Sequence, residues 1–258
     1  MSTRPQPPGD DARLGLTLSG GGAFGAAHVG VLQVLEERAI HPGIVTGTSS
    51  GALVGAAYAA GVDGPRLDEI ARRFHWGRIV RWTARPRWAL LDSHAVTDAI
   101  IALLGEDPRI EDLPRRFAAV TTDLRARRIH AIRSGPLSTA LRATMAVPGL
   151  LPPVRVGGRL LADGGMIDNV PFGAAREFGA DRVIVVRLHA KGESVRMMRT
   201  VKNTAALVRD PSIVLIQPEM ERMAQWSMRD VPRLIDEGRR AAEAALDAGG
   251  AVSPRPRP

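Results

Sequence analysis

Residues 18–30 read LSGGGAFGAAHVG, and this glycine-rich stretch joins an apolar run to a helical pattern. Upstream, residues 14–19 alternate and are rich in Leu and Thr, which predicts a strand. Downstream, Val29, Leu32 and Leu35 recur at helical spacing, so residues 26–38 are predicted to form a helix. A strand that passes through a glycine loop into a helix is typical of α/β folds with a parallel sheet.

The loop satisfies the G-x-G-x-x-G pattern of dinucleotide-binding turns through residues 20–25. In that fold, an acidic residue about 20 positions further on binds the ribose. Here the second predicted strand, residues 44–46, runs into Gly47-Thr48-Ser49-Ser50-Gly51, which holds neither Asp nor Glu. The glycines are also not followed by the Lys-Ser/Thr of a P-loop. We therefore expect no nucleotide cofactor, and no metal is predicted.

Residues 47–51, GTSSG, instead match the G-x-S-x-G pattern of a nucleophile elbow. The match falls after a strand and before a helix predicted at residues 52–60, where such an elbow presents its serine on a sharp turn. Ser49 is therefore the candidate nucleophile, although an ordinary Gly/Ser turn is the alternative. The main-chain N–H groups of the glycine loop would then stabilise the oxyanion of an acyl-transfer reaction. The candidate residues for this oxyanion hole are Gly20, Gly21, Gly22 and Gly25.

A serine nucleophile needs a general base, and none of the six histidines stands in a motif that marks one. His28 is expected to be packed or to cap its helix, and His189 is the best candidate if a triad exists. Asp163 is the other candidate, because it follows the apolar residues 160–162 and precedes Gly164-Gly165. Desolvation would raise its basicity. A simple Asp-Gly turn is the alternative interpretation of this segment.

The remaining sequence predicts one domain, residues 13–248, between disordered tails at residues 1–12 and 249–258. The chain has 258 residues, of which 45% are hydrophobic, so it can form a sizeable core. It has no cysteine, which excludes disulfides, thiolate metal sites and a cysteine nucleophile. Further strands are predicted at residues 117–122, 128–133, 181–188 and 212–218, a hairpin at 154–163, and helices at 65–74, 93–104, 137–145 and 231–248.

The net charge is +8, and residues 72–91, RRFHWGRIVRWTARPRWALL, concentrate arginine and tryptophan. Tryptophan favours membrane interfaces and arginine is drawn to anionic headgroups, so this segment is a candidate lid or docking patch. Tryptophans packed in the core beneath solvated arginines are the alternative. No signal peptide or membrane span is recognisable, and no nucleic-acid module, so we expect a cytoplasmic protein with peripheral membrane contact. The aromatic residues proposed for that contact are Phe74, Trp76, Trp82 and Trp88.

Together, GGGAFG, GTSSG and the Asp-Gly-Gly that starts at Asp163 resemble the motifs of the patatin-like phospholipase family. Neighbouring segments, such as ATMAVPGLLPPV and MIDNVPFGAAREFGADRVIVV, are also similar to that family. The resemblance extends from about residue 14 to residue 190. It implies a three-layer α/β sandwich with a mostly parallel central sheet, distantly similar to α/β-hydrolases.

The resemblance further implies a Ser49–Asp163 dyad without histidine, an oxyanion loop formed by residues 20–22 and Gly25, and hydrolysis of a lipid carboxylic ester through an acyl-enzyme. One departure is Phe24, which stands where family members often carry Arg or Lys. An ester less polar than a phospholipid is therefore an alternative substrate. Acyl transfer to another acceptor and a non-catalytic lipid-binding or regulatory role are the alternative functions, and the oligomeric state is not predicted.

Overall fold

The computed structural model describes residues 11–73, 81–82, 91–92, 95–188, 207, 209–221, 223–224 and 227–248. The predicted tails lie mostly outside these ranges, although strand β1 begins at Asp11, just before the predicted start of the domain. His189, Phe74, Trp76 and Trp88 also lie outside the described residues, and only the backbone of Trp82 is described. The proposed docking patch and the alternative base therefore remain predictions.

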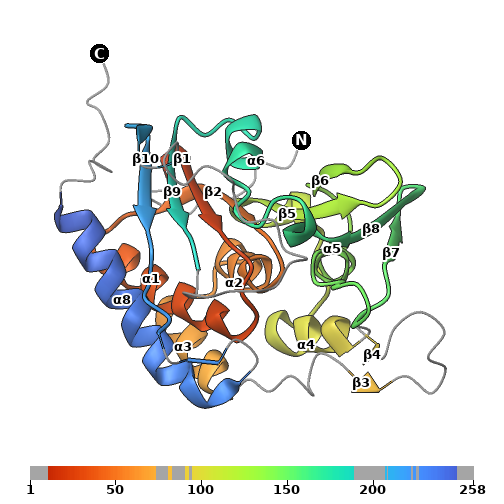
Figure 1. Ribbon diagram of the computed structural model, residues 1–258, viewed down its shortest axis with the longest axis horizontal. Helices are drawn as coiled ribbons and strands as arrows, with labels where there is room; N and C mark the ends of the chain where they lie inside the picture. The colour runs from red at the N-terminus through yellow and green to blue at the C-terminus, as the bar shows by residue number, and fades with distance from the viewer. Residues whose placement is uncertain are drawn as a thin grey trace.

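The central sheet has the strand order β10-β9-β1-β2-β5-β8-β7, with β6 paired to β5 (Figure 1). From β10 to β5 every pairing is parallel, so the predicted mostly parallel sheet is confirmed. Beyond β5 the sheet continues through antiparallel pairs. Tight turns connect β5 to β6 and β7 to β8, whereas β6, α5 and β7 separate β5 from β8 in the chain. The strands are β1 (Asp11–Leu18), β2 (Pro42–Gly47), β5 (Arg116–Asp123), β6 (Arg128–Ile132), β7 (Val154–Val156), β8 (Arg159–Asp163), β9 (Arg182–Val186) and β10 (Ile213–Ile216), while β3 (Arg81–Trp82) and β4 (Leu91–Asp92) pair separately.

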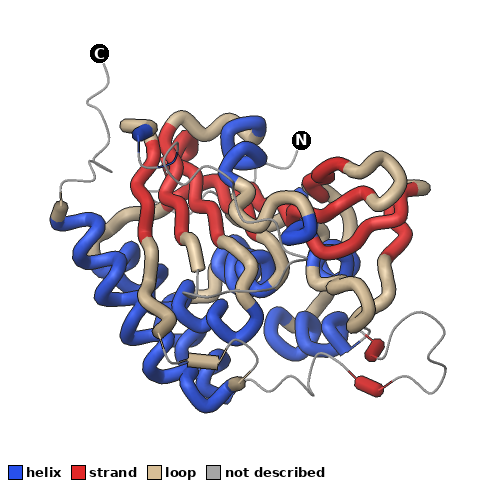
Figure 2. Tube along the Cα trace, viewed as in Figure 1, coloured by secondary structure: helices blue, strands red, loops and turns tan. Residues whose placement is uncertain are grey.

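Helices cover both faces of the parallel part of the sheet, which gives the predicted three layers (Figure 2). On one face, α8 packs against α1 and β10, α1 packs against α3, and α2 lies against β2 and β5. On the other face, α6 packs against β1, β2 and β9. Within the described ranges, no helix combines the length and apolar character needed to cross a bilayer. The helices are α1 (Ala26–Glu37), α2 (Ser50–Ala59), α3 (Gly64–Arg73), α4 (Ala95–Leu104), α5 (Leu137–Thr144), α6 (Phe172–Glu177) and α8 (Val231–Asp247).

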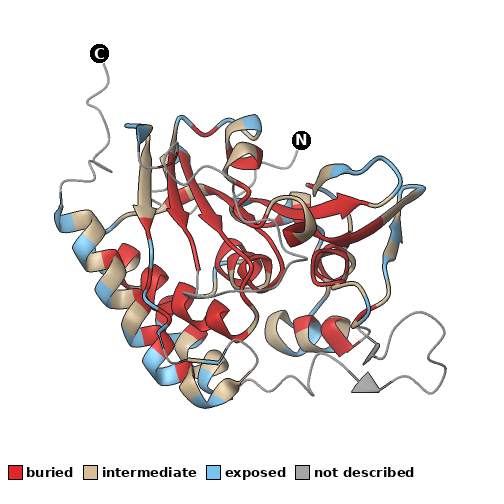
Figure 3. Cartoon of the chain, in the orientation of Figure 1, coloured by how far each residue is buried: buried red, intermediate tan, exposed pale blue. Residues whose placement is uncertain are grey.

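The core is split by the sheet into a large and a small part, and the central strands are buried on both faces (Figure 3). The large part includes Leu16, Leu32 and Phe117, each almost fully inaccessible to solvent. The small part lies under α6 and includes Ile44, Val170 and Val183. Burial on both faces explains why these strands read as continuous apolar runs. Helix α6, which the sequence did not predict, has only six residues, too few to show a helical period.

The topology brings three distant motifs to one edge of the sheet. The glycine loop follows the carboxyl end of β1, and the GTSSG segment follows the carboxyl end of the neighbouring β2. In β5, Ala119 pairs with Gly47 of β2, and Thr121 pairs with Asp163 at the end of β8. Asp163 therefore lies one strand away from the serine turn. Ligand sites in open α/β sheets commonly lie at the carboxyl ends of the strands.

Candidate active site

Ser49 occupies a strained turn between β2 and α2, as the sequence predicts. Its backbone has φ 53° and ψ −122°, a conformation that is uncommon for a residue with a side chain. The flanking glycines are required by close backbone contacts. A methyl group on Gly47 would lie 2.6 Å from the Ala52 nitrogen, and one on Gly51 would lie 2.5 Å from the Ser19 carbonyl oxygen. The G-x-S-x-G spacing therefore reflects how tightly the turn packs against β1 and α2.

A hydrogen bond between the main chain of Ser49 and a side chain of α5 fixes the backbone of the elbow. The Ser49 N–H donates to Thr144 Oγ1 at 3.0 Å, and the Thr144 hydroxyl donates in turn to the Val120 carbonyl oxygen. Ser49 is 9% exposed, and Thr144 is fully buried. Thr144 thus links the elbow to strand β5 and was not identified from the sequence, because a threonine at the end of a helix carries no distinguishing signal.

The glycine loop starts beside this serine and continues into a short 3₁₀ helix, η1 (Gly22–Gly25). A methyl group on Gly20 would lie 3.3 Å from Ser49 Cβ, so the loop approaches the elbow closely. The Gly20 N–H donates to the Asn169 carbonyl oxygen at 3.3 Å. Within the part of the chain that the structure describes, the N–H groups of Gly21 and Gly22 donate no hydrogen bond. These two are the candidate oxyanion donors, whereas Gly25 packs against Ser50.

Two buried polar side chains hold the glycine loop in place. The Asn169 side-chain Nδ2 donates to the Gly20 carbonyl oxygen at 3.1 Å. His28 lies in the first turn of α1, and its Nε2 is 2.8 Å from the Ser19 carbonyl oxygen. Burial lowers the pKa of His28 to about 4, although this hydrogen bond opposes the shift, so the ring is neutral at pH 7. His28 is packed, as expected, and supports the loop. Asn169 was not predicted, because its role depends on a contact with a residue far away in sequence.

Asp163 ends strand β8 and is 1% exposed. Its main-chain N–H donates to the Ala146 carbonyl oxygen at 3.0 Å, and its Oδ1 accepts a hydrogen bond from the Gly165 N–H at 2.7 Å. Burial raises the pKa of Asp163 to about 6, while the Gly165 N–H and the Ser49 hydroxyl favour its charged form. The second oxygen, Oδ2, has no hydrogen bond of standard geometry among the described residues. The Asp163 carboxyl therefore lies close to the serine and has a pKa above the usual value. Its Oδ2 has no hydrogen-bond partner among the described residues.

Asp168 is a second carboxyl near the elbow that the sequence did not single out. Burial raises its pKa to about 6 as well, and its Oδ1 accepts a hydrogen bond from the Val170 N–H at 3.1 Å. Its carbonyl oxygen accepts a hydrogen bond from the Thr48 hydroxyl at 3.3 Å. Ser49 is not among the groups that influence its pKa, which distinguishes it from Asp163.

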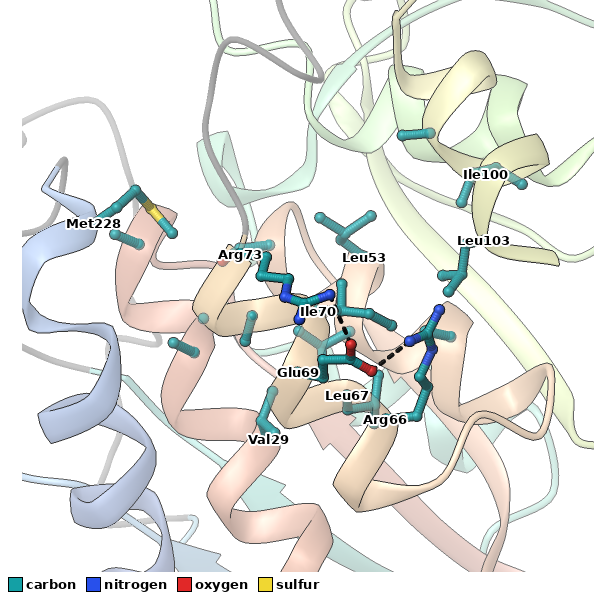
Figure 4. A pocket seen from close by; sticks show the side chains of 18 of the residues that line it. Val29, Leu53, Arg66, Leu67, Glu69, Ile70, Arg73, Ile100, Leu103 and Met228 are labelled. Atoms are coloured by element: carbon teal, nitrogen blue, oxygen red, sulfur yellow. Dashed lines mark hydrogen bonds and ion pairs between the residues drawn. The ribbon is translucent and has the colours of Figure 1, made fainter.

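A cavity of about 630 Å³ lies beside the elbow, between α1, α2, α3 and α4. Gly22, Gly25 and Ser50 line it where it meets the glycine loop and the start of α2. Most of the other lining residues are apolar, and several of them face one another across the space in Figure 4. The cavity has the size and apolar character of a small-molecule site, typically about 300–1,000 Å³. Phe24, which departs from the family pattern, is buried in the core and does not line it.

Comparison with known proteins places these features in a family. The chain is 40% identical over 187 residues to an uncharacterized NTE family protein of Mycobacterium tuberculosis, covering 69% of this chain and 49% of that protein. It is 35% identical over 192 residues to patatin-like phospholipase domain-containing protein 6 of Mus musculus, covering 70% of this chain and 14% of that protein. The chain thus spans about half the length, or less, of these curated relatives.

Solved structures with the same fold are VipD from Legionella pneumophila and the type III effector protein ExoU. VipD matches with a TM-score of 0.58 and 16% identity, covering 91% of this chain and 66% of that chain. ExoU matches with a TM-score of 0.54 and 14% identity, covering 95% and 54% respectively. The family model for patatin-like phospholipases matches residues 16–176, which include the glycine loop, the elbow and Asp163. The chain therefore belongs to the patatin-like phospholipase family.

Proposed function

We propose that the protein is a serine hydrolase of lipid carboxylic esters that uses Ser49 as nucleophile and Asp163 as general base. The observation that carries this proposal is the position of a buried carboxyl of raised pKa beside a serine on a strained elbow. Family membership supports action on lipids. The N–H groups of Gly21 and Gly22, which donate no hydrogen bond within the described residues, could stabilise the negative charge of an oxyanion beside that serine.

In the proposed reaction, Ser49 Oγ attacks the ester carbonyl carbon while its proton passes to Asp163. The carbonyl oxygen becomes an oxyanion, which accepts hydrogen bonds from the N–H groups of Gly21 and Gly22. When the C–O bond breaks, Asp163 returns the proton to the departing alcohol, and an acyl-enzyme remains on Ser49. Asp163 then takes a proton from water as that water attacks the acyl-enzyme. When the second intermediate collapses, Asp163 passes this proton to Ser49 Oγ, which releases the acid and restores the free serine and the ionised carboxylate.

The atom proposed to receive the serine proton is Oδ2 of Asp163, which has no hydrogen-bond partner among the described residues. Its other oxygen is held by the Gly165 N–H, which orients the carboxyl group. A base works best when its pKa is near the operating pH, and burial moves this carboxyl in that direction. The hydrogen bond between a nucleophile and its base is often loose in a free enzyme and tightens when substrate binds. Asp163 Oδ2 lies near the Ser49 hydroxyl without a hydrogen bond of standard geometry, which is compatible with such a loose contact.

A fluorophosphonate probe, which reacts with activated serines, tests the assignment directly. We expect the native chain to be labelled, Ser49→Ala to be unlabelled, and Asp163→Asn to be labelled at least 100-fold more slowly, since loss of a general base typically costs about 10²–10⁴ in rate. Ser134→Ala removes an exposed serine and is the matched control for the nucleophile. Asp168→Asn removes the other carboxyl of raised pKa and is the control for the base.

The outcomes of this experiment separate the alternatives. Labelling that persists in Ser49→Ala would disprove the nucleophile assignment. Native labelling rates in Asp163→Asn combined with a loss in Asp168→Asn would transfer the role of base to Asp168. Hydrolysis of lipid esters in the native chain, measured as release of free fatty acid, distinguishes a hydrolase from an acyltransferase, which would form a new ester with an added alcohol. Binding of lipid without labelling would favour the non-catalytic alternative.

A further inference from the structure

The positive charge of the protein is concentrated in the antiparallel part of the sheet. Residues 113–162, which include β5, β6, α5 and β7, contain nine arginines and a single acidic residue, Asp123. This segment has a formal net charge of +8, equal to that of the whole chain, so the rest of the chain is formally neutral. Figure 1 shows that these elements lie together at one end of the molecule. Charge gathered in this way creates a local field that attracts anions.

Two hairpins bring much of this charge to one place. The β5–β6 turn (residues 124–127) and the β7–β8 turn (residues 157–158) extend from the same end of the sheet, because Asp123 of β5 pairs with both Arg128 of β6 and Leu161 of β8. The tips of both hairpins are exposed (Figure 3). A methyl group on either glycine of the second turn would meet no atom within 4 Å, so this turn borders open space.

Four arginines on these hairpins are exposed and form no ion pair or side-chain hydrogen bond with other described residues. We call them the hairpin surface, and they are Arg125, Arg127, Arg128 and Arg155. Arg159 differs from them, because its guanidinium lies 3.8 Å from the Asp123 carboxylate. A guanidinium presents several N–H donors in a plane and binds phosphate oxygens in pairs. The hairpin surface therefore offers four such groups to an anionic partner.

The pKa of His130, on β6, reports the electrostatic field beside these hairpins. Burial lowers this pKa most, and the charge of Arg159 lowers it next. Asp123 raises it, whereas Arg128 and Arg133 act in the same direction as Arg159. Three arginines thus act on this ring against one carboxylate. The positive charge is felt beyond the exposed tips.

The hairpins extend past the edge of the sheet at which the candidate active site lies. In β5, Ala119 pairs with Gly47, the last residue of β2 before the serine elbow. Strand β5 runs parallel to β2 and continues from Ala119 to Asp123, about 13 Å further. Ser49 follows the same end of β2. The hairpin surface and the elbow are therefore reached from the carboxyl ends of the same two strands.

We propose that the hairpin surface docks the protein on membranes that contain anionic phospholipids. The inference rests on the proposed function, because a lipid ester hydrolase meets its substrate at a lipid surface. A nucleic acid offers the same phosphate chemistry, but the position of the hairpins beside the proposed hydrolytic site favours a membrane. Each arginine that reaches an anionic bilayer is expected to strengthen binding about fivefold.

Vesicle flotation tests this proposal. The protein carries Ser49→Ala so that lipid is bound without turnover, and the vesicles are phosphatidylcholine with about one third phosphatidylglycerol. We expect binding at low ionic strength, and at least 50-fold weaker partitioning when Arg125, Arg127, Arg128 and Arg155 are all replaced by Gln. Raising the salt from about 0.1 M to about 1 M should also release the protein, because the Debye length falls from about 10 Å to about 3 Å.

A variant of equal net charge is the matched control. It replaces four exposed arginines on other elements by Gln, namely Arg13, Arg38, Arg209 and Arg240. This control loses as much positive charge as the hairpin variant but keeps the hairpin surface, so its partitioning should stay within about fivefold of the parent protein. Thermal unfolding midpoints of both variants show whether they remain folded. Equal losses of binding in the two variants would assign the attraction to overall charge and overturn the docking surface.

Hydrolysis provides a second measurement with Ser49 intact. The hairpin variant should hydrolyse dissolved p-nitrophenyl butyrate at a rate within about twofold of the native rate, since none of the four arginines belongs to the proposed site. Its hydrolysis of p-nitrophenyl palmitate carried in the phosphatidylglycerol vesicles should be at least tenfold slower. Equal losses on both esters would indicate damage to the active site and contradict a docking role.

The two measurements separate failure of this proposal from failure of the proposed function. If the hairpin variant loses vesicle binding while the native chain hydrolyses no ester, the docking surface stands and the proposed function fails. If the native chain hydrolyses esters but vesicle binding is absent or unaffected by the substitutions, the docking surface is wrong and the proposed function stands. Binding of a single-stranded RNA oligonucleotide in place of the vesicles, lost in the hairpin variant, would assign the surface to nucleic acid and overturn the proposal.

Discussion

The main-chain N–H of Ser49 donates a hydrogen bond to the side-chain oxygen of Thr144, over a distance of 3.0 Å. Thr144 ends helix α5 and also donates to the carbonyl oxygen of Val120 in strand β5. Ser49 has a positive φ of 53°, a conformation that typically costs about 1–3 kcal/mol and needs support from its surroundings. The threonine hydroxyl provides that support by linking the elbow to the sheet.

Replacing this hydroxyl is therefore expected to impair the proposed reaction without removing a reacting group. Thr144→Val keeps the shape of the side chain but leaves the Ser49 N–H without its acceptor, a loss of about 1–3 kcal/mol. We expect kcat to fall about 10- to 100-fold with little change in KM, as measured with a short-chain ester. Thr144→Ser retains the hydroxyl and should stay within about threefold of the native rate. Equal rates in all three proteins would show that the elbow does not depend on this contact.

Asp163 is expected to lower the stability of the folded protein at neutral pH. Its pKa is about 6 in the folded state against 3.8 for the ordinary carboxyl, so the folded state binds the proton more tightly. The free energy of unfolding consequently decreases as pH rises from about 4 to about 6. Asp163→Asn removes this penalty and should raise the free energy of unfolding above pH 7 by up to about 3 kcal/mol, while activity is lost.

Urea unfolding at several pH values checks the Asp163 prediction. The difference between the native chain and Asp163→Asn should be small near pH 4 and grow to its full value above pH 7. Asp168→Asn should behave in the same direction, because its carboxyl pKa is also raised to about 6. His28 acts in the opposite direction, since its pKa is lowered to about 4. A lower stability of Asp163→Asn at neutral pH would contradict the expected cost of the buried charge.

The pH dependence of the reaction should follow the same carboxyl. Asp163 accepts a proton only when it is ionised, so kcat/KM for an uncharged ester should rise with pH and level off above about 6. Below that value the rate should fall about tenfold per pH unit. Asp168→Asn should preserve the midpoint of this profile. A midpoint near 4, or one that disappears only in Asp168→Asn, would assign the controlling ionisation to another group.

Helices α1 and α8 approach so closely that they need glycine at their contact. A methyl group on Gly238 would collide with the Ala27 carbonyl oxygen, and one on Gly30 would collide with the carbonyl of Ile235. Gly238→Ala should therefore separate the helices and lower the free energy of unfolding by about 1–3 kcal/mol or more. Gly173→Ala in α6 meets no atom within 4 Å and should be neutral or stabilising by up to about 1 kcal/mol. Equal midpoints of thermal unfolding for the two variants would contradict the close contact.

The segment of residues 74–90 remains a predicted membrane contact. It follows α3, which lines the cavity, and it carries three of the four tryptophans in the chain. Replacement of Trp76, Trp82 and Trp88 by Ala is expected to reduce flotation with anionic phosphatidylglycerol vesicles at least fivefold. Trp226→Ala removes the fourth tryptophan and serves as the control. Undiminished flotation of a variant that is still folded would reject the contact.

Much of the candidate site was predictable because its signals are local. The glycine loop and the G-x-S-x-G turn are short motifs whose neighbours in sequence are also their neighbours in space. Asp163 was a candidate base for a similar reason, because an apolar strand precedes it and two glycines follow it. Thr144 and Asn169 were not, although they hold the elbow and the loop. Each acts on a residue more than 90 positions away, and no local pattern distinguishes them from other threonines and asparagines.

The sequence by itself determined where the strands and helices of the parallel core lie, which family's motifs the chain carries and which serine is the candidate nucleophile. These follow from periodicity and from backbone geometry that only glycine permits. Only the tertiary structure decided that Asp163 lies close to Ser49, that burial raises its pKa, and that a mostly apolar cavity lies beside Ser50. Strand order, burial and cavities depend on contacts between segments far apart in the chain, and such contacts leave no period in the sequence.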